Sequence, residues 1–164
     1  MKTGYTVSDA MTQEPVYVAP DLSVSEAAAA MKEFKVGSLL IKEGDTVVGI
    51  CTERDMVFNI IAADKKASSI PIKEVMTTNL KTISADKDIF DALMQMRDFN
   101  VRRLPVVNGK NFVGLLTLKD VLKIEPQLFD LLVDKMEIRE AENKPIRAPT
   151  EDGSDDVDEI INRT

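Results

Sequence analysis

The stretch GICTERD, residues 49–55, returns as GLLTLKD at residues 114–120. Both copies keep a glycine, a threonine three positions later and an aspartate three positions after that, and a basic residue precedes each aspartate. A shift of 65 positions aligns residues 11–55 with residues 76–120 without a gap, and 13 of the 45 aligned pairs are identical. Chance would give about three such pairs, so the chain is an internal tandem repeat.

Each copy predicts the same order of elements, a β-α-β-β-α unit. A short extended run opens the unit and a helix follows, with Ser23 and Glu26 at capping-box spacing in the first copy and Asp88 as the candidate N-cap in the second. Two β-rich runs around a turn come next, and Asn108-Gly109 is a strong hairpin signal. The opening strand, first helix, two-stranded hairpin and second helix are expected at residues 15–20, 23–35, 36–52 and 54–64 in the first copy. In the second copy the same four elements are expected at residues 80–84, 88–100, 104–117 and 119–124.

Two such units predict an α/β (α+β) fold in which the exposed faces of two small sheets are buried against each other. The predicted boundaries are residues 1–65 for the first repeat and 66–125 for the second, with a polar linker between them. Residues 126–143 begin with a proline and carry one apolar stripe, which predicts an amphipathic helix. Residues 144–164 contain prolines and then acidic residues, and this composition predicts disorder.

The composition excludes several classes of protein. No apolar run approaches the ~20 residues that a membrane-spanning helix needs, so we expect a soluble, cytoplasmic protein without a membrane partner. The chain contains no histidine, and Cys51 is its one cysteine. The usual general base and the commonest zinc ligand are therefore missing, and we expect neither an enzyme nor a metal site. The net charge of −7 disfavours nucleic-acid binding, although much of the acidity lies in the C-terminal tail.

The junction between the last strand and the second helix of each unit suggests a nucleotide site. Glycine at the strand start permits close approach, a helix N-terminus favours phosphate, and Arg54 or Lys119 adds a positive charge. Asp55 or Asp120, near the helix start, can accept two hydrogen bonds, as from the two hydroxyls of a ribose. The alternative is purely structural, because Thr-x-x-Asp at a helix start is also a capping box that needs no ligand.

The combined pattern resembles a tandem pair of cystathionine β-synthase (CBS) domains, a Bateman-type module. The resemblance rests on VSDAMT, SEAAAAMKEFKVGSLLI and VVGICTERD, repeated as IKEVMT, DALMQMRDFNVRRLPVV and FVGLLTLKD, and covers residues 5–124. It implies two units paired about a pseudo-twofold axis, with two clefts for adenosine compounds: AMP, ADP, ATP, S-adenosylmethionine or a dinucleotide. It also implies a homodimer, and it requires no cofactor.

The resemblance further implies which residues hold the ligand. At the junctions the aspartates would bind ribose hydroxyls, the threonines would face ribose or phosphate, and the basic residues would approach phosphate; these residues are Asp55, Asp120, Thr52, Thr117, Arg54 and Lys119. The hairpin backbone expected to hold adenine comprises Ser38, Leu39, Leu40, Arg103, Leu104 and Pro105. The opening strands would line the base slot with Val16, Val18, Lys81 and Ile83.

The two copies differ at one position of the resemblance that concerns phosphate. The second copy carries Arg102-Arg103 where the first carries Gly37-Ser38. Arginine binds phosphate well, so we expect a phosphorylated ligand to be better neutralised wherever these arginines reach, and the two sites to be unequally occupied. The structural alternative is a surface strand end with solvated charges.

Three functions remain open from the sequence. The first is a regulatory module that senses adenosine ligands and passes the occupancy on to an unknown partner protein or to its own assembly. The second is a ligand-free interaction or oligomerisation module that uses its C-terminal segment. The third, nucleic-acid binding, is disfavoured by charge.

Overall fold

The computed structural model describes residues 2–129 of the chain. Most of the predicted helix 126–143 and all of the predicted tail 144–164 lie outside the described residues. Residues up to Leu128 form one compact unit that contains both repeats. Among the described residues, no helix combines the length and the apolar character that crossing a bilayer would require.

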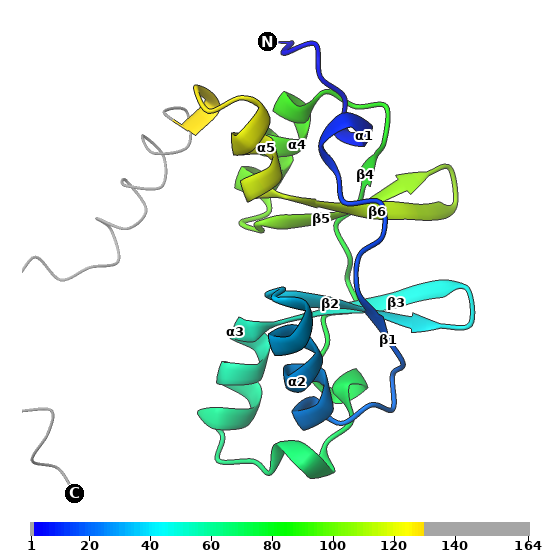
Figure 1. Ribbon diagram of the computed structural model, residues 1–164, viewed down its shortest axis with the longest axis vertical. Coiled ribbons are helices and arrows are strands. Elements are labelled where there is room, and N and C mark those ends of the chain that lie inside the picture. Colours follow the sequence, from blue (N-terminus) through cyan, green and yellow to red (C-terminus); the bar gives the residue numbers. More distant parts are fainter. Residues whose placement is uncertain (1, 130–164) are drawn as a thin grey trace, which may run out of the picture. The chain divides into compact units, whose positions relative to one another are not determined.

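The β-α-β-β-α order predicted for both copies is confirmed (Figure 1). The first repeat consists of β1 (Tyr17–Val18), α2 (Val24–Phe34), β2 (Ser38–Glu43), β3 (Thr46–Thr52) and α3 (Glu53–Met56), which continues into the π-helical turn η1 (Val57–Ile61). The second consists of β4 (Ile83–Ser84), α4 (Ile89–Asp98), β5 (Arg103–Asn108), β6 (Asn111–Thr117) and α5 (Leu118–Ile124).

Three short helices were not predicted. The helix α1 (Val7–Ala10) precedes the first repeat, and the 3₁₀ turns η2 (Ala67–Ser69) and η3 (Ile72–Glu74) precede the second. The first residue of α1 and the first residue of η3 are themselves 65 positions apart, so each repeat opens with a helical turn. Such single turns are too short to produce a helical period in the sequence.

Side-chain caps fix where the longer helices begin, as the sequence predicted. The Ser23 hydroxyl accepts the Glu26 N–H at 3.2 Å, and the Glu26 carboxylate accepts the Ser23 N–H at 3.0 Å. Asp88 caps α4 by accepting the Phe90 N–H at 2.8 Å. These bonds satisfy N–H groups that lack partners inside a helix, and they stabilise each helix start by roughly 1 kcal/mol.

The strands form two three-stranded sheets, ordered β1-β2-β3 and β4-β5-β6. In each sheet the opening strand is parallel to the second strand, which forms an antiparallel hairpin with the third. The register pairs Ser38 with Thr52 and Arg103 with Thr117. The start of each hairpin therefore lies beside the start of the helix that follows it. Gly44 and Gly109 adopt positive φ at the hairpin turns, which glycine tolerates without strain.

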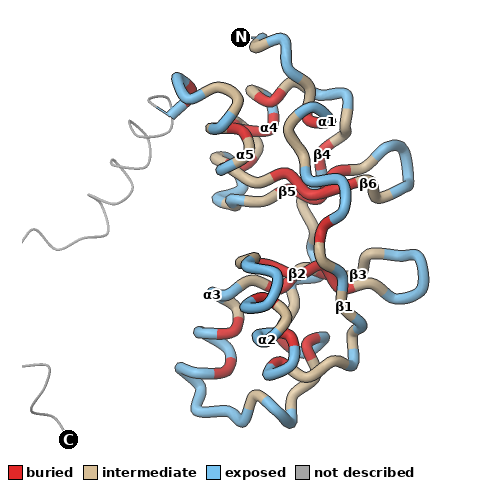
Figure 2. The backbone as a smooth tube through the Cα atoms, viewed as in Figure 1, coloured by how far each residue is buried: buried red, intermediate tan, exposed pale blue. Residues whose placement is uncertain are grey.

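The apolar core lies on the strands and on the inner sides of the helices (Figure 2). Successive residues of β2 are fully buried, Leu39 and Ile41 in the cluster beneath α2 and Leu40 between them. Side chains alternate between the two faces of a strand, so both faces of this sheet are covered. This agrees with the prediction that the two sheets bury their faces against each other.

The opening segments of the two repeats are exchanged. Residues 7–12 bind to the second repeat: the N–H of Val7 donates to the carbonyl of Lys87 at 2.7 Å, and Thr12 exchanges two backbone hydrogen bonds of 2.9 Å with Leu115. In Figure 1 the chain accordingly passes from α1, beside α4, to β1 in the other sheet. Each opening segment therefore completes the repeat to which it does not belong in sequence.

The reciprocal contact is made by residues 70–77, which bind to the first repeat. The N–H of Ile72 donates to the carbonyl of Leu22 at 2.7 Å, and Thr77 exchanges backbone hydrogen bonds of 2.8 and 3.0 Å with Ile50. Ile72 and Val75 belong to the buried cluster of the first repeat. The linker that the composition suggested, residues 63–71, contains the turn η2, and its Ile70 carbonyl accepts the Val24 N–H at 2.9 Å.

Candidate functional site

The Thr52–Asp55 turn, called the Asp55 junction below, has the geometry of a complete capping box. The Asp55 N–H donates to the Thr52 hydroxyl oxygen at 3.3 Å. One carboxylate oxygen of Asp55, Oδ2, accepts from the Thr52 N–H at 2.8 Å and from the Thr52 hydroxyl at 2.7 Å. The interpretation of the motif as a helix-capping box is therefore correct.

The Thr117–Asp120 turn, called the Asp120 junction, repeats this arrangement. The Asp120 N–H donates to the Thr117 hydroxyl oxygen at 3.3 Å. Oδ2 of Asp120 accepts from the Thr117 N–H at 3.1 Å and from the Thr117 hydroxyl at 2.5 Å. At both junctions the aspartate is half-buried, and its Oδ1 accepts no hydrogen bond from any described residue. Each aspartate thus caps its helix with one oxygen and keeps the other for a further donor.

The helix N-termini offer fewer unpaired donors than the sequence suggested. The first N–H of α3, on Glu53, donates to the Gly37 carbonyl at 3.3 Å, and the first N–H of α5, on Leu118, donates to the Arg102 carbonyl at 2.9 Å. The third N–H of each helix belongs to the capping box. Backbone donors alone would therefore hold a phosphate weakly, and side-chain cations must supply most of the attraction.

Two of the predicted cationic ligands make contacts with neighbouring aromatic rings. The Arg54 guanidinium lies 4.9 Å from the centre of the Phe58 ring, one turn further along the same helix. The Lys81 ammonium lies 5.0 Å from the centre of the Phe99 ring. Both contacts are cation–π interactions worth about 0.5–1 kcal/mol on an exposed surface. A phosphate would have to draw Arg54, its predicted ligand, away from the Phe58 ring, whereas Lys119 is exposed. Lys81, which was predicted to line the base slot, is engaged with Phe99.

Arg103 reaches the Asp55 junction from the other repeat. A Cβ placed on Gly37 would lie 3.0 Å from Nη2 of Arg103 and 2.9 Å from Oε2 of Glu53. Burial lowers the pKa of the Arg103 guanidinium, Glu53 raises it, Arg102 lowers it and Asp55 raises it, with a net lowering. The predicted phosphate-binding arginine therefore lies beside Glu53 at the start of α3, within range of the Asp55 charge, and the missing side chain at Gly37 leaves room for this approach.

Glu53 is the residue at this site that sequence reasoning missed. Its counterpart in the second repeat is Leu118, so the repeat comparison gave no reason to single it out. Glu53 and Arg103 do not form a direct ion pair, although both point at the same space above Gly37. Only the contact across the two repeats reveals the carboxylate beside the arginine.

The residues predicted to hold adenine are mostly buried in the sheets. Leu39, Leu40 and Leu104 are fully buried, and Ser38 is 8% exposed. Leu40 donates its N–H to the Val16 carbonyl at 3.0 Å, as part of the pairing of β1 with β2. The backbone of this hairpin is therefore already partly engaged.

The predicted base slot is also partly occupied by the core. Val16 and Val18 pack in part against the cluster of the first repeat, and Ile83 is buried. Pro105, which has no N–H to offer, is buried in β5. These residues can present edges of their side chains to a ligand, and Lys81 is the polar member of the group.

The repeated glycines have a packing role that explains the motif. A Cβ on Gly114 would lie 2.7 Å from the Thr12 carbonyl oxygen and 2.8 Å from Sδ of Met11. A Cβ on Gly49 would meet Met76, with Cγ at 2.9 Å. The predicted close approach to the glycines is thus made by the Met-Thr pair that opens the opposite repeat. The two halves of the repeated pattern are in contact across the exchanged segments.

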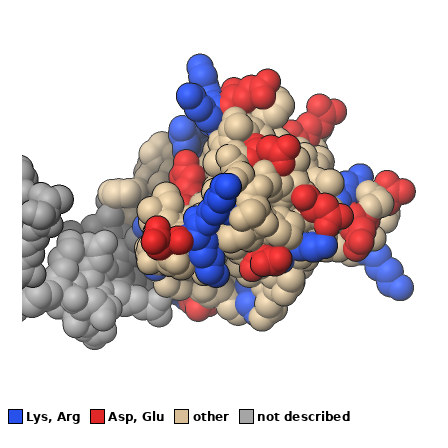
Figure 3. Space-filling model, turned by 90° about the horizontal axis from the view of Figure 1, so that it is seen from below, with Lys and Arg blue, Asp and Glu red and all other residues tan. Residues whose placement is uncertain are grey.

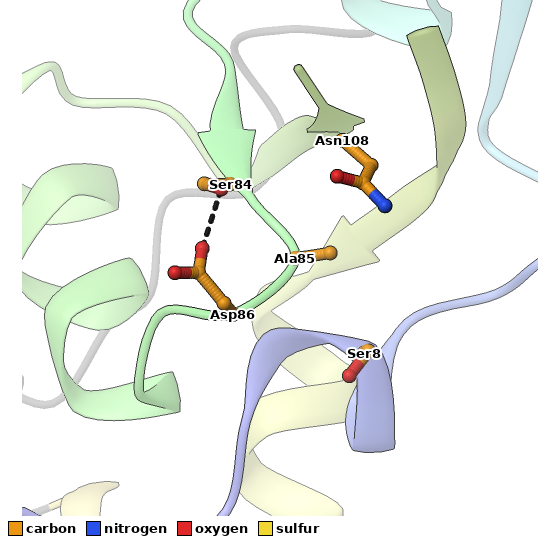
Figure 4. A pocket seen from close by; sticks show the side chains of 5 residues that line it. All are labelled: Ser8, Ser84, Ala85, Asp86 and Asn108. Atoms are coloured by element: carbon orange, nitrogen blue, oxygen red, sulfur yellow. Dashed lines mark hydrogen bonds between the residues drawn. The ribbon is translucent and has the colours of Figure 1, made fainter.

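Two open hollows lie away from both junctions. One, of about 470 Å³, is lined by Ser8, Ser84, Ala85, Asp86 and Asn108 (Figure 4). The Ser84 hydroxyl in this hollow is hydrogen-bonded to Asp86. Asn108 ends β5 at the opposite end from Arg103, so this hollow lies at the other end of the strand from Arg103. The second, beside the N-terminal segment, includes neither Asp55 nor Asp120.

The surface charges are mixed on the face drawn in Figure 3, where acidic and basic side chains are interspersed. A nucleic-acid surface requires clustered positive charge, and this face provides none among the described residues. Within the described part of the chain, no group of three or more acidic or cysteine side chains is arranged to hold a metal ion.

Comparison with known proteins identifies relatives over nearly the whole described chain. The family model for the CBS domain matches twice, at residues 7–62 and 72–126. The CBS domain-containing protein YhcV of Bacillus subtilis is 33% identical over 116 residues, which are 71% of this chain and 82% of YhcV.

Solved structures give the same result. A crystal structure of an uncharacterized conserved protein from Pyrococcus horikoshii has a TM-score of 0.71 and 30% identity, covering 76% of this chain and 94% of that protein. The CBS domain pair of protein MJ0100, in complex with methylthioadenosine and S-adenosylmethionine, has a TM-score of 0.65 and 28% identity, covering 73% of this chain and 94% of that one.

Proposed function

The chain belongs to the CBS-domain family as a tandem pair, and from this premise we propose that it is a regulatory module that binds an adenosine-containing ligand at its strand-to-helix junctions. The observation that carries the proposal is the pair of half-buried aspartates, Asp55 and Asp120, each with one carboxylate oxygen held by a threonine and the other without a donor. A carboxylate fixed in this way is preorganised to accept ribose hydroxyls, so little side-chain entropy is lost on binding.

The solved relative with methylthioadenosine and S-adenosylmethionine supports the class of ligand. Both compounds contain adenosine and neither contains a phosphate, so ribose and adenine contacts are the common requirement. In this chain Arg103 adds a cation at the Asp55 junction. Candidate ligands are therefore S-adenosylmethionine, methylthioadenosine, AMP, ADP and ATP, with no cofactor required.

We further propose that the module has no catalytic activity and signals ligand occupancy through a partner protein or through its own homodimer in the cytoplasm. One oxygen of each motif aspartate already caps its helix, and the sequence has no histidine that could act as a general base. A ligand can change the assembly only if it binds the two assembly states with different affinities.

A second candidate, a ligand-free interaction module, is favoured by one specific observation. The second helix of the first repeat exposes Val57, Phe58 and Ile61, and Ile61 is 71% exposed. Exposed apolar side chains on consecutive helical turns are typical of protein interaction surfaces. Since both capping boxes are complete without a ligand, the fold itself does not require one.

Thermal melting with each candidate ligand tests the choice between the two functions. A ligand that binds the native state raises the melting temperature by mass action. The matched variants are Asp55→Asn and Asp120→Asn, which keep an acceptor for the threonine but remove the charge that ribose hydroxyls favour. We expect each variant to lose the ligand shift at its own junction while its ligand-free melt changes little. If millimolar adenosine compounds leave the wild-type melt unchanged, the interaction function replaces the first.

A further inference from the structure

The Asp55 junction is the place where opposite charges from the two repeats meet. Arg103 begins β5 in the second repeat, and Glu53 begins α3 in the first. Nη2 of Arg103 and Oε2 of Glu53 both lie within 3.0 Å of the point where a side chain at residue 37 would begin. These two side chains fill the place that a side chain at residue 37 would take, so a ligand group that binds beside the Arg103 guanidinium also lies near the Glu53 carboxylate.

The arginine is held near the carboxylates without being neutralised by direct contact. Arg103 is half-buried, and among the described residues it makes no ion pair. Glu53 and Asp55 nevertheless lie close enough to act on its pKa. A guanidinium in this position remains able to bind an anionic ligand, but any such anion also meets the repulsion of Glu53.

The Asp120 junction carries different side chains at the equivalent positions. Leu118 stands in place of Glu53, Ser38 in place of Arg103 and Arg102 in place of Gly37. Arg102, whose carbonyl accepts the Leu118 N–H, supplies a cation there, but no carboxylate corresponds to Glu53. The carboxylate that caps the helix is the same in both junctions, so the difference lies in the side chains beside the helix start. The capping geometry therefore cannot account for a difference in ligand preference between the two junctions.

We propose that Glu53 is a specificity-determining residue that limits the number of phosphate groups accepted at the Asp55 junction. Arg103 attracts the first phosphate, and Glu53 repels each additional negative charge because it faces the same space. This inference rests on the proposed function of the junction. It assigns to the Asp55 junction an adenosine ligand with one phosphate or none, in preference to a triphosphate.

Removing one charge tests this inference. The measurement is the dissociation constant for adenosine, AMP and ATP in an Asp120→Asn background. The second junction is disabled in this background, so the measured binding comes from the Asp55 junction. Glu53→Gln should leave adenosine binding unchanged and tighten ATP binding by roughly tenfold, with AMP between them, since the electrostatic effect scales with ligand charge. The gain should shrink at high salt, because mobile ions screen the charges.

Two matched variants separate this effect from general changes. Glu43→Gln removes the same charge at the far end of β2 and should not alter the preference. Arg103→Ser, which copies Ser38, should weaken AMP binding by a larger factor than adenosine binding. Equal changes for adenosine and ATP in Glu53→Gln, or no change, would overturn the inference.

An arm without adenosine keeps the inference distinct from the proposed function. Inorganic triphosphate should bind Glu53→Gln more tightly than the Asp120→Asn parent, by a similar factor. If adenosine compounds bind but Glu53→Gln treats all ligands alike, the charge selection is wrong and the proposed function stands. If triphosphate responds to the substitution but no adenosine compound binds, the charge selection stands and the proposed function is wrong.

Discussion

The Asp55 and Asp120 junctions share one backbone frame but differ in the charges around it. The Asp–Thr contacts that cap the helices agree within a few tenths of an ångström. Glu53 and Arg103 lie beside Gly37 at the Asp55 junction, whereas the equivalent positions in the other copy of the repeat are Leu118, Ser38 and Arg102. The repeat has thus preserved what the helix start requires and has diverged in the charged side chains beside it. A ligand that fits the shared frame will not bind the two junctions equally.

The largest expected difference between the repeats concerns the two glycines. Gly114→Ala should cost roughly 3 kcal/mol of unfolding free energy and Gly49→Ala roughly 1 kcal/mol, because overpacking is expensive when the neighbour cannot move. The added methyl at residue 114 meets the Thr12 carbonyl, which is fixed by the paired hydrogen bonds with Leu115, whereas at residue 49 it meets a flexible methionine. Urea denaturation measures both values, with exposed Ser25→Ala as the control. Equal costs would contradict this explanation.

A smaller difference is expected at the helix caps. Asp88 accepts the Phe90 N–H at 2.8 Å, which caps α4. It also accepts the Thr3 N–H at 2.9 Å, the Thr3 hydroxyl at 2.8 Å and the Gly4 N–H at 3.1 Å, so it binds the N-terminal segment to α4 as well. Ser23 caps α2 but binds no second segment of the chain in this way. Asp88→Ala should therefore destabilise the protein by about 2 kcal/mol and Ser23→Ala by about 1 kcal/mol.

The Asp88 effect should depend on pH in a defined direction. Burial alone would raise the pKa of this carboxyl, but the hydrogen bonds from Phe90, Thr3 and Gly4 outweigh burial and lower it. A lowered pKa stabilises the folded state above the unfolded pKa near 4, and the stabilisation is lost as the pH falls through the lowered folded value. The stability gap between wild type and Asp88→Ala should narrow on acidification. If the stability difference between wild type and Asp88→Ala widens as the pH falls, the predicted direction of the pH dependence is wrong.

The smallest expected difference concerns Cys51, whose counterpart is Leu116. Burial, helped by the charge of Asp55, raises the pKa of the Cys51 thiol to about 12. The unfolded thiol ionises near pH 9 and the folded one does not, so the protein should lose about 1 kcal/mol of stability between pH 9 and pH 10 through this group. Cys51→Ala should lack this alkaline loss. Rapid alkylation of native Cys51 at pH 8 would contradict its burial.

The sequence predicted the fold through features that are local or repeated. The 65-residue shift, the caps at Ser23 and Asp88 and the hairpin glycines all depend on neighbouring residues, and all appear in the structure. The exchange of opening segments could not be predicted, because VSDAMT and IKEVMT would look the same whichever sheet they contacted. The contact of Gly114 with Met11 requires the three-dimensional arrangement of the repeats.

The candidate site was predicted in part for the same reason. Asp55 and Asp120 were found because the motif recurs, and their capping role was recognised as the alternative. Glu53 was missed because it has no counterpart, and the approach of Arg103 to the Asp55 junction was missed because Arg103 comes from the other repeat. Repetition identifies what two copies have in common and says little about contacts between them.

The exchanged opening segments give the protein a single cooperative unfolding unit. Residues 70–77 belong in sequence to the second half but complete the core of the first, and residues 7–12 do the reverse. Separating the two halves exposes apolar surface on both. A fragment cut between them would lack the segment that completes its own core and would carry the segment that completes the other half. If a ligand binds at one junction as proposed, the free energy it adds is therefore shared across the tandem, and unfolding of the whole protein would report it.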